Sequence, residues 1–258
     1  MNLITSRDNP LVKELRRLSQ DSTMYRKQGR VWLEGDHLCR AVLARGIKPE
    51  HAVFAESLWA TAPHAWTQVA ERNTVLPDAL FSEISNLESP AKMGFVLAIA
   101  TSQEVQSSTP SVVLDRVQDA GNVGSILRSA SAFGFKQILA IKGSAALWSP
   151  KVLRAGMGAH FGLHLVEGLS VEDLGALDMP WLATSSHQGP FLHTLLAESK
   201  LPMPCAWLMG HEGQGVSEVL FERAALHVRI SQPGGEESLN VASAAAICLH
   251  ASATSYLR

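Results

Sequence analysis

The stretch that decides the fold runs from residue 205 to residue 245 and reads CAWLMGHEGQGVSEVLFERAALHVRISQPGGEESLNVASAA. It contains two apolar segments, Cys205–Met209 and Leu226–Ile230, and each leads directly into a glycine-rich loop. A helical pattern follows each loop, so the order strand, loop, helix occurs twice. In open α/β sheets, ligands bind just outside the carboxyl ends of the strands. The two junctions therefore predict a small-molecule pocket in an α/β domain.

A third junction of the same form, VVLDRVQDAGNVGSILRSASAFGF, occupies residues 112–135. We treat the three junctions as one site. The candidate residues are Asn122 and Arg128 in this junction, Glu212 between glycines, and Ser238 and Asn240 before the last helix. Each has a purely structural alternative: a helix cap, a surface charge or an ordinary glycine-rich turn. We expect Ser238 to cap the last helix, with Leu239, Asn240 and Val241 in its first turn.

Composition is typical of a globular protein with a large core. The 258 residues are 46% hydrophobic and 18% charged. The chain contains no uninterrupted apolar run of about 18 residues, so no membrane span is expected, and the N-terminus lacks the apolar core of a signal peptide. Three well-separated cysteines, Cys39, Cys205 and Cys248, argue for a reducing compartment and against disulfides or a zinc site. We therefore expect a cytoplasmic protein without a structural metal.

Charge is distributed unevenly along the chain. The net charge is −2, but residues 1–48 hold ten Lys or Arg against five Asp or Glu, a net of +5. A basic front segment followed by an acidic remainder is compatible with a nucleic-acid-binding module beside a catalytic one. Arg16, Arg17 and Arg26 are candidate phosphate contacts. The alternative is a solvated helix face without a partner.

The chain alternates predicted strands and helices in two blocks, separated by the polar segment TSQEVQSSTP at 101–110, which we interpret as a linker. The first block, residues 1–100, predicts a small α/β domain whose first helix begins at Asn9-Pro10. The second block, 111–258, predicts a mostly parallel sheet with helices on both faces. Its expected strands are 112–115, 137–141, 163–166, 181–184, 205–209 and 226–230. Its expected helices are 122–133, 150–156, 171–177, 191–197, 217–224 and 239–254.

Three motifs occur in order in the second block: D-x-G-N-V-G-S-I-L-R, L-M-G-H-E-G-Q-G-V and E-S-L-N-V-A-S-A. Together they resemble the signature motifs of the SpoU (TrmH-like) RNA 2′-O-ribose methyltransferases, over about residues 111–255. The segment VWLEGDHLCRAVLARG of the first block resembles the ribosomal-protein-like substrate-binding domain that often precedes this catalytic domain. The resemblance implies the SPOUT fold, an α/β sheet with a deep trefoil knot at its C-terminal end, and a homodimer.

The resemblance also assigns roles to residues. It implies that S-adenosylmethionine is bound in the knot, largely by backbone groups, at Thr184, Gly210, Ile230 and Leu239. It implies catalytic roles for Asn122, Arg128, Glu212, Ser238 and Asn240, and a substrate-binding role for Arg154. Ribosomal RNA is the first expected substrate and transfer RNA the second. The third motif departs from the family pattern because Ser231 replaces the usual proline.

Two other function classes remain open from the sequence. One is an RNA-binding relative that has lost catalysis, although all five polar family positions are present. The other is a dehydrogenase on a doubly wound sheet. The absence of a dinucleotide-binding fingerprint from the first strand–helix unit argues against this class. A metal site at His160 and His164 is disfavoured because the segment resembles the start of a strand and no carboxylate companion follows.

Overall fold

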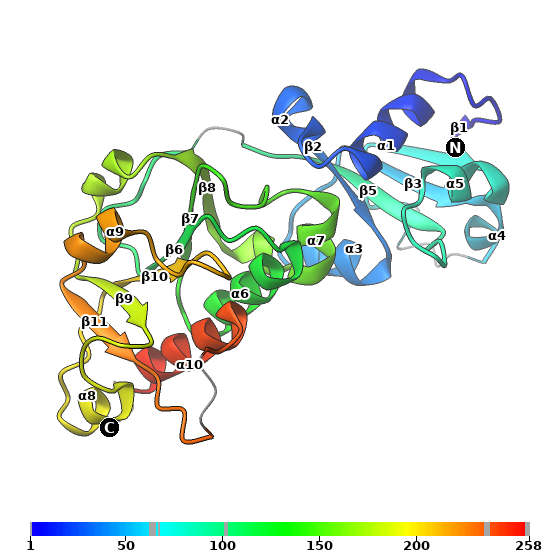
Figure 1. Cartoon of the computed structure of the whole chain (residues 1–258). Helices are drawn as coiled ribbons and strands as arrows, with labels where there is room; N and C mark the ends of the chain where they lie inside the picture. The colour runs from blue at the N-terminus through cyan, green and yellow to red at the C-terminus, as the bar shows by residue number, and fades with distance from the viewer. Residues whose placement is uncertain (1, 62–65, 67, 101–102, 235–237, 256–258) are drawn as a thin grey trace. The chain divides into compact units, whose positions relative to one another are not determined.

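The computed structural model describes residues 2–61, 66, 68–100, 103–234 and 238–255. Two compact units are present (Figure 1). The first unit contains residues up to 101 together with 148–161, and the second contains 102–147 and 162–258. The segment 148–161 falls inside the block that the sequence assigns to one domain, yet it makes its contacts within the first unit.

The first unit is built on a mixed five-stranded sheet. Its strand order is β1 (Asn2–Leu3), β4 (Arg72–Leu76), β3 (His51–Ala55), β5 (Met93–Ala98) and β2 (Arg30–Glu34). Strands β1, β4 and β3 are parallel, whereas β5 is antiparallel to β3 and β2. The helices of this unit are α1 (Pro10–Gln20), α2 (Met24–Gln28), α3 (Asp36–Leu43), α4 (Glu56–Trp59), α5 (Asp78–Ile84), α7 (Pro150–Gly156) and the 3₁₀ turn η2 (Ala159–Gly162).

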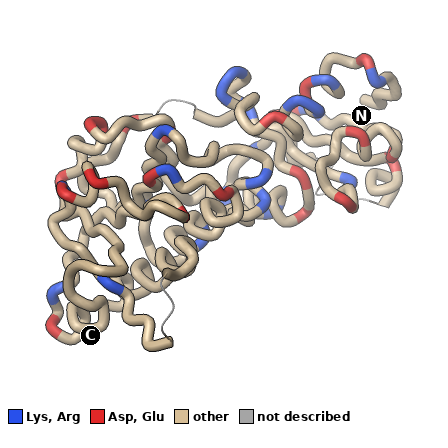
Figure 2. The backbone as a smooth tube through the Cα atoms, in the orientation of Figure 1, with Lys and Arg blue, Asp and Glu red and all other residues tan. Residues whose placement is uncertain are grey.

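Helix α1 begins where the sequence predicts. The Asn9 side chain accepts a hydrogen bond from the Leu11 N–H at 2.9 Å, and proline occupies the first helical position. Val12, Leu15 and Leu18 recur at helical spacing and are buried in the core of the first unit. The opposite face of α1 and the following helix α2 carry Lys and Arg, drawn in blue in Figure 2. The amphipathic pattern thus exposes the basic residues as expected.

The second unit is built on a six-stranded sheet, all of whose paired strands are parallel. The strand order is β11 (Leu226–Arg229), β9 (Trp181–Ser185), β10 (Ala206–Gly210), β6 (Ser111–Asp115), β7 (Gln137–Ile141) and β8 (His164–Leu169). Its helices are α6 (Ala120–Ala132), α8 (Leu192–Ala197), α9 (Glu218–Arg223), α10 (Val241–Thr254) and the 3₁₀ helix η3 (Glu172–Ala176). The predicted parallel α/β architecture is confirmed.

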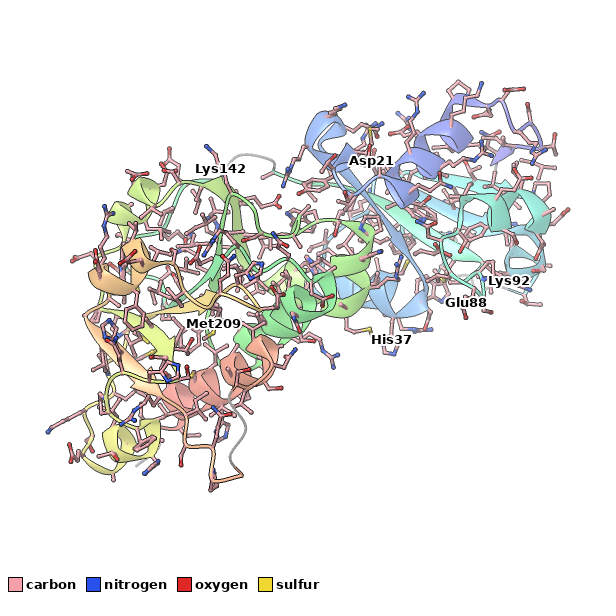
Figure 3. The ribbon with its side chains drawn as sticks, in the orientation of Figure 1. Asp21, His37, Glu88, Lys92, Lys142 and Met209 are labelled. Carbon is pink, nitrogen blue, oxygen red and sulfur yellow. The ribbon has the colours of Figure 1, made fainter. Side chains whose placement is uncertain are left out.

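Helices cover both faces of this sheet. Val113 and Leu208 of the strands share one core with Leu220 of α9. On the other face, the buried Trp207 donates its Nε1–H to Ser252 of α10 at 2.9 Å, and α10 packs along α6. Met209, labelled in Figure 3, is fully buried in the same strand as Trp207. The strands are therefore apolar on both sides, as is typical of parallel sheets.

Two segments differ from the predicted pattern. The sequence pattern also predicts a helix over 63–72; that segment lies partly outside the described residues, and β4 already begins at Arg72. The polar segment before β6 is attached to the second unit: the Gln106 N–H donates to Gln137 Oε1 at 2.7 Å, and Gln137 Nε2 donates to the Gln106 carbonyl at 3.0 Å. These two hydrogen bonds hold the middle of the expected linker against Gln137 of β7.

The three cysteines are free and buried. Burial raises the pKa of each thiol well above its ordinary value, so these thiols stay protonated at neutral pH. The described part of the chain contains no cluster of three or more His, Cys, Asp or Glu side chains suited to a metal ion. In the same residues, no helix combines the length and apolarity that crossing a membrane requires.

Candidate active site

The candidate site lies at the carboxyl edge of the second unit's sheet. Strands β6 and β10 are neighbours, and their last residues, Asp115 and Gly210, are paired in register. The loops that follow these two strands therefore lie side by side, although they are about one hundred positions apart in the chain. This is the edge at which open α/β sheets bind ligands.

The loop after β6 ends in a capped helix. Asp119 is the N-cap of α6, and its carboxylate accepts a hydrogen bond from the Asn122 N–H at 2.8 Å. The helix begins at Ala120, two residues before the predicted start, because the aspartate satisfies an N–H of the first turn. Asn122 is therefore held in the first turn with its side chain near the loop after β10.

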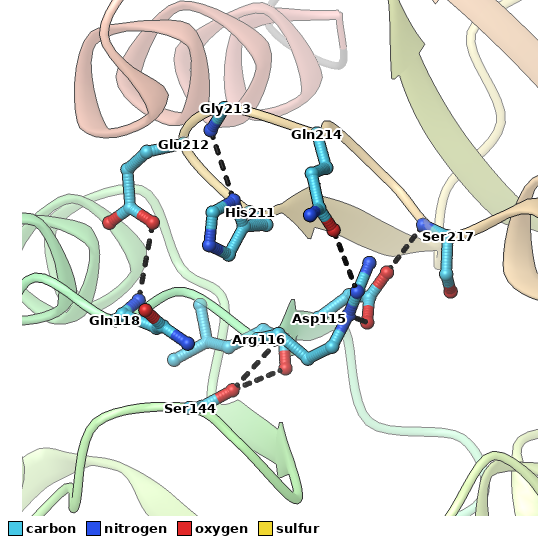
Figure 4. A network of polar contacts seen from close by, with 10 residues as sticks. Asp115, Arg116, Gln118, Ser144, His211, Glu212, Gly213, Gln214 and Ser217 are labelled. Carbon is cyan, nitrogen blue, oxygen red and sulfur yellow. Dashed lines mark hydrogen bonds and ion pairs between the residues drawn. The ribbon is translucent and has the colours of Figure 1, made fainter.

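Glu212 joins the two loops. Its carboxylate accepts hydrogen bonds from the N–H groups of Gln118 at 3.2 Å and Asp119 at 3.0 Å, and from Asn122 Nδ2 at 3.1 Å. The contact with Gln118 is drawn in Figure 4. Burial alone would raise the pKa of Glu212, but the donors from Asp119, Asn122 and Gln118 outweigh it and lower the pKa below its ordinary value. Glu212 is thus a carboxylate at neutral pH and acts as an acceptor.

Asn240 connects the site to α10. Its Oδ1 accepts from the N–H groups of Ala242 at 2.9 Å and Ser243 at 3.3 Å, so Asn240 is the N-cap of α10. Its Nδ2 donates to Asn122 Oδ1 at 2.9 Å. The prediction that Ser238 caps this helix is wrong, because α10 begins only at Val241. An asparagine at the cap position can satisfy two N–H groups and still offer its amide to another residue.

The side chains of Glu212, Asn122 and Asn240 form a series of hydrogen bonds in which every donor points toward Glu212. A carboxylate can only accept, so Asn122 must turn its NH₂ toward Glu212 and its oxygen toward Asn240. The Asn240 oxygen is committed to the helix, so its NH₂ must face Asn122. Each amide has a second N–H beyond these bonds. The chain therefore presents hydrogen-bond donors at the edge of the sheet.

The loop between Gly210 and Gly215 is held tightly. The His211 and Gly215 backbones exchange hydrogen bonds of 3.0 and 2.8 Å, and a Cβ at Gly210 would lie 2.1 Å from the Gly215 carbonyl carbon. The Gly213 N–H donates to His211 Nδ1 at 3.0 Å. This bond holds the His211 ring against the turn that follows it.

The remaining predicted catalytic residues are not joined to this chain of bonds. Arg128 lies on α6 and is exposed, and Ser238 is exposed before the cap of α10. Within the described residues, neither side chain forms a hydrogen bond or ion pair. Their groups are free to contact a substrate. Arg154 lies on α7 in the first unit, where it borders a small cavity lined also by Trp32 and Glu34.

The predicted cofactor positions share one edge of the sheet. Thr184 is the second-last residue of β9, Gly210 ends β10, and Ile230 follows β11 directly. These three strands are adjacent in the sheet, in the order β11, β9, β10. Leu239, the fourth position, is an exposed apolar residue before the cap of α10. Backbone groups at strand ends beside apolar side chains suit a cofactor that is held mainly by main-chain hydrogen bonds.

An apolar groove of about 600 Å³ lies on the same unit, next to Ile230. The groove is lined by α8, by the two residues after β11 and by α10, with the side chains of Leu192, His193, Leu196, Ile230, Ser231, Ala246, Ile247, His250, Ala251 and Thr254. None of the five predicted catalytic residues lines it. The groove thus shares Ile230 with the predicted cofactor positions but none of the predicted catalytic residues.

The predicted phosphate contacts of the first unit are in different states. Arg16 donates to Glu83 at 3.1 Å, so its charge is already paired. Arg26 lies over the Tyr25 ring, 5.5 Å from the ring centre. Arg17 is exposed and has no ion-pair partner in the described chain. Of the three, Arg17 is thus the one that can bind a phosphate without breaking an ion pair or a ring contact described above.

Sequence reasoning missed two residues that hold the site together. Asp119 caps α6 and donates its N–H to Glu212, and Gln118 donates a second N–H. The signal for Asp119 was present, since an aspartate three residues before a helical asparagine is a common cap. Gln118 gave no signal because it contributes only its backbone.

Comparisons with known proteins agree with this arrangement. Residues 109–250 match the family model described as the SpoU rRNA methylase family, and residues 9–94 match an MRM3-like substrate-binding domain. An uncharacterized tRNA/rRNA methyltransferase of Synechocystis is 32% identical, with 96% of this chain and 92% of the relative covered. The 23S rRNA (guanosine(2553)-2′-O)-methyltransferase RlmP of Bacillus subtilis is 29% identical, with 97% and 98% covered.

Solved structures give the same picture. The AdoMet-bound rRNA methyltransferase of Sinorhizobium meliloti aligns with a TM-score of 0.81 and 26% identity, covering 100% of this chain and 98% of the other. A structure of an RNA 2′-O ribose methyltransferase aligns with a TM-score of 0.79 and 28% identity, covering 99% and 100%.

Proposed function

This chain belongs to the SpoU rRNA methylase family, and we propose that it transfers the methyl group of S-adenosylmethionine to a ribose 2′-hydroxyl of ribosomal RNA. The observation that carries the proposal is the hydrogen-bonded chain of Glu212, Asn122 and Asn240. Residues of three separate motifs meet there, at the edge where the cofactor positions also lie. Ribosomal RNA is favoured over transfer RNA because the RlmP relative, named for 23S rRNA, is covered almost completely.

The reaction requires few chemical changes. The ribose oxygen forms a bond to the methyl carbon, the sulfur–carbon bond breaks, and the 2′-hydroxyl proton leaves. When bound, S-adenosylmethionine supplies the electrophilic methyl group. The task of the protein is to hold the hydroxyl in line with that carbon, since orientation can lower a barrier by about 7–11 kcal/mol in the best cases. The free N–H groups of Asn122 and Asn240 are suited to orienting ribose or phosphate oxygens.

Arg128 supplies positive charge to this reaction. An arginine side chain stays protonated in proteins, so it is a poor general base. We assign it the binding of the substrate phosphate or hydroxyl and the stabilisation of negative charge that develops on the ribose oxygen. Its exposure and its freedom from ion pairs within the described chain support this role. The proton would pass to phosphate or water.

Replacement of Arg128 tests the proposal directly. We expect Arg128→Ala to lower methyl transfer to rRNA fragments by about 100-fold or more, because removing one stabiliser of a developing oxyanion costs about that much. The dissociation constant for S-adenosylmethionine, measured by calorimetry, should stay nearly the same. Equal turnover by wild type and Arg128→Ala would remove this role from Arg128. If the wild type methylates tRNA but no rRNA fragment, the substrate is tRNA and not rRNA.

The first unit is proposed to bind the RNA through the basic face of α1 and α2. Replacing a phosphate-binding residue should weaken binding of all sequences and reduce the salt dependence of log K by about 1. We expect this result for Arg17→Ala in binding titrations at several salt concentrations. Lys200→Ala is a matched control, because Lys200 is an exposed cation of the second unit paired with Glu198. Identical salt slopes for Arg17→Ala and wild type would exclude Arg17 as a phosphate contact.

We also propose that the protein is a homodimer. The apolar groove between α8 and α10, with the exposed Ile247 in it, is suited to a second copy of the chain. Helix α10 carries apolar side chains around much of its circumference, since Ile247, Cys248 and Leu249 are consecutive. The trefoil knot and a cytoplasmic location stay predictions. Three free, buried cysteines are compatible with a reducing compartment.

A further inference from the structure

Arg116 has no role in the proposed reaction, yet it occupies a position of unusual geometry beside the site. It directly follows the buried Asp115 at the end of β6, and its backbone has a φ of +61°. A non-glycine residue in the left-handed region is strained and persists only where its surroundings hold it. The contacts of Arg116 therefore need an explanation.

Three contacts hold the residue in place. The Arg116 N–H donates to Ser144 Oγ at 3.1 Å, which itself donates to the Leu114 carbonyl at 2.9 Å. The guanidinium donates through Nε to Asp115 at 3.0 Å. It also donates through Nη1 to Gln214 Oε1 at 3.1 Å, in the loop that carries Glu212 (Figure 4). The side chain thus bridges the ends of two strands.

The same loop is held at three further points. Asp115 accepts from Arg116 through Oδ1, and through Oδ2 it accepts from the Ser217 N–H at 2.6 Å. Glu212 accepts from the two backbone N–H groups of Gln118 and Asp119. The Asp115–Arg116 pair therefore fixes one flank of the loop 211–217, and Glu212 is bound on the other flank. Glu212 can orient Asn122 only while the loop keeps this position.

We propose that Arg116 is a positioning residue for methyl transfer: by clamping Gln214, it holds the loop 211–217 so that Glu212 directs the amide of Asn122. The inference rests on the proposed function of the site. The guanidinium is partly exposed and close to the loop, but its role here is to hold the protein and not to contact the substrate. Asp115 supports it by neutralising and aiming the guanidinium.

Two substitutions and their combination test the clamp. Arg116→Asn introduces a residue that tolerates a positive φ but is too short to reach Gln214. Gln214→Ala removes the oxygen that accepts from the Arg116 guanidinium. We expect each to lower kcat about tenfold, because each removes the charge-assisted hydrogen bond between the Arg116 guanidinium and Gln214. The KM for S-adenosylmethionine should stay within about twofold. The double variant should be no slower than either single variant, because both remove the same interaction. Arg116→Lys should recover part of the activity.

Hydrogen exchange provides a readout that does not need catalysis. Exchange of the Gln118 and Asp119 amides should speed up in Arg116→Asn and in Gln214→Ala, since both amides depend on Glu212. Lys142→Asn, at an exposed cation that follows β7, is the matched control and should change neither exchange nor kcat.

The clamp is overturned if the kcat losses of the two single variants multiply in the double variant. It is also overturned if amide exchange is unchanged in the single variants, or if exchange is faster while kcat stays at the wild-type value. Absence of methyl transfer by the wild type would instead refute the proposed function and leave the exchange test valid.

Discussion

Glu212, Asn122 and Asn240 differ in chemistry, and their order in the hydrogen-bonded chain follows from that difference. The carboxylate is the one member of the three that only accepts, so it sets the direction in which both amides point. Its lowered pKa keeps it ionised over the whole neutral range. The role that we assign to Glu212 is therefore orientation of Asn122, and not proton transfer.

Glu212→Gln tests this role. The new amide places an NH₂ group among three donors, so at least one of them loses its acceptor. We expect kcat to fall by about 10–100-fold, in line with the loss of about 1–3 kcal/mol for an unsatisfied polar group. The affinity for S-adenosylmethionine should change little. A variant with wild-type kcat would show that the carboxylate does not orient the site.

The pH dependence of stability follows from the same carboxylate. Its pKa is lower in the folded state than in the unfolded state, so its stabilisation is complete above the unfolded value of about 4.3 and is lost as pH falls through the lower folded value. The Tm difference between wild type and Glu212→Gln should be constant near neutral pH and should shrink only below about pH 4. A difference that already disappears between pH 6 and 7 would contradict the lowered pKa.

At the scale of elements, α10 begins directly after its cap Asn240, whose side chain performs two tasks. Its oxygen caps the helix, and its NH₂ reaches Asn122 on α6. The start of one helix is thus tied to the first turn of another. This explains why the cap lies two residues after the predicted Ser238: a serine hydroxyl at the cap could not also donate to Asn122 over the same distance.

The two tasks of Asn240 can be separated by substitution. Asn240→Asp keeps an excellent cap but has no N–H for Asn122, so we expect near wild-type Tm with a kcat reduced about tenfold or more. Asn240→Ala loses both functions and should also be destabilised by about 1 kcal/mol. Thermal unfolding and methyl-transfer rates measured on both variants check this. If Asn240→Asp retains full activity, the bond to Asn122 has no part in orienting the site.

At the scale of the whole molecule, we propose that the apolar groove on the second unit is the dimer interface. Ile247 is 41% exposed in this groove. We expect the wild type to be a dimer in light scattering and Ile247→Glu to be a monomer, because a buried unpaired carboxylate opposes association. Val219→Glu is the matched control, since Val219 is 48% exposed on α9 and does not line the groove. A monomeric wild type, or a dimeric Ile247→Glu, would exclude this interface.

Local patterns in the sequence determined which segments are strands and helices in the second unit. Parallel strands that are buried on both faces, such as β6 and β10, are continuous apolar runs and were found within one residue. The Asn9-Pro10 start of α1 was found because a cap and its proline are adjacent in the chain. The motif residues Asn122, Glu212 and Asn240 were also singled out, because glycine-rich loops with acids and amides follow strands.

Tertiary structure alone decided which of these residues meet. The bonds from Asn122 to Glu212, from Asn240 to Asn122 and from Arg116 to Gln214 join residues 90, 118 and 98 positions apart. No local periodicity encodes such contacts; they depend on the strand order that places β10 beside β6. The cap of α10 likewise shifted from Ser238 to Asn240. An isolated sequence offers both as caps, and the start of the helix at Val241, with Asn122 beside it, selects Asn240.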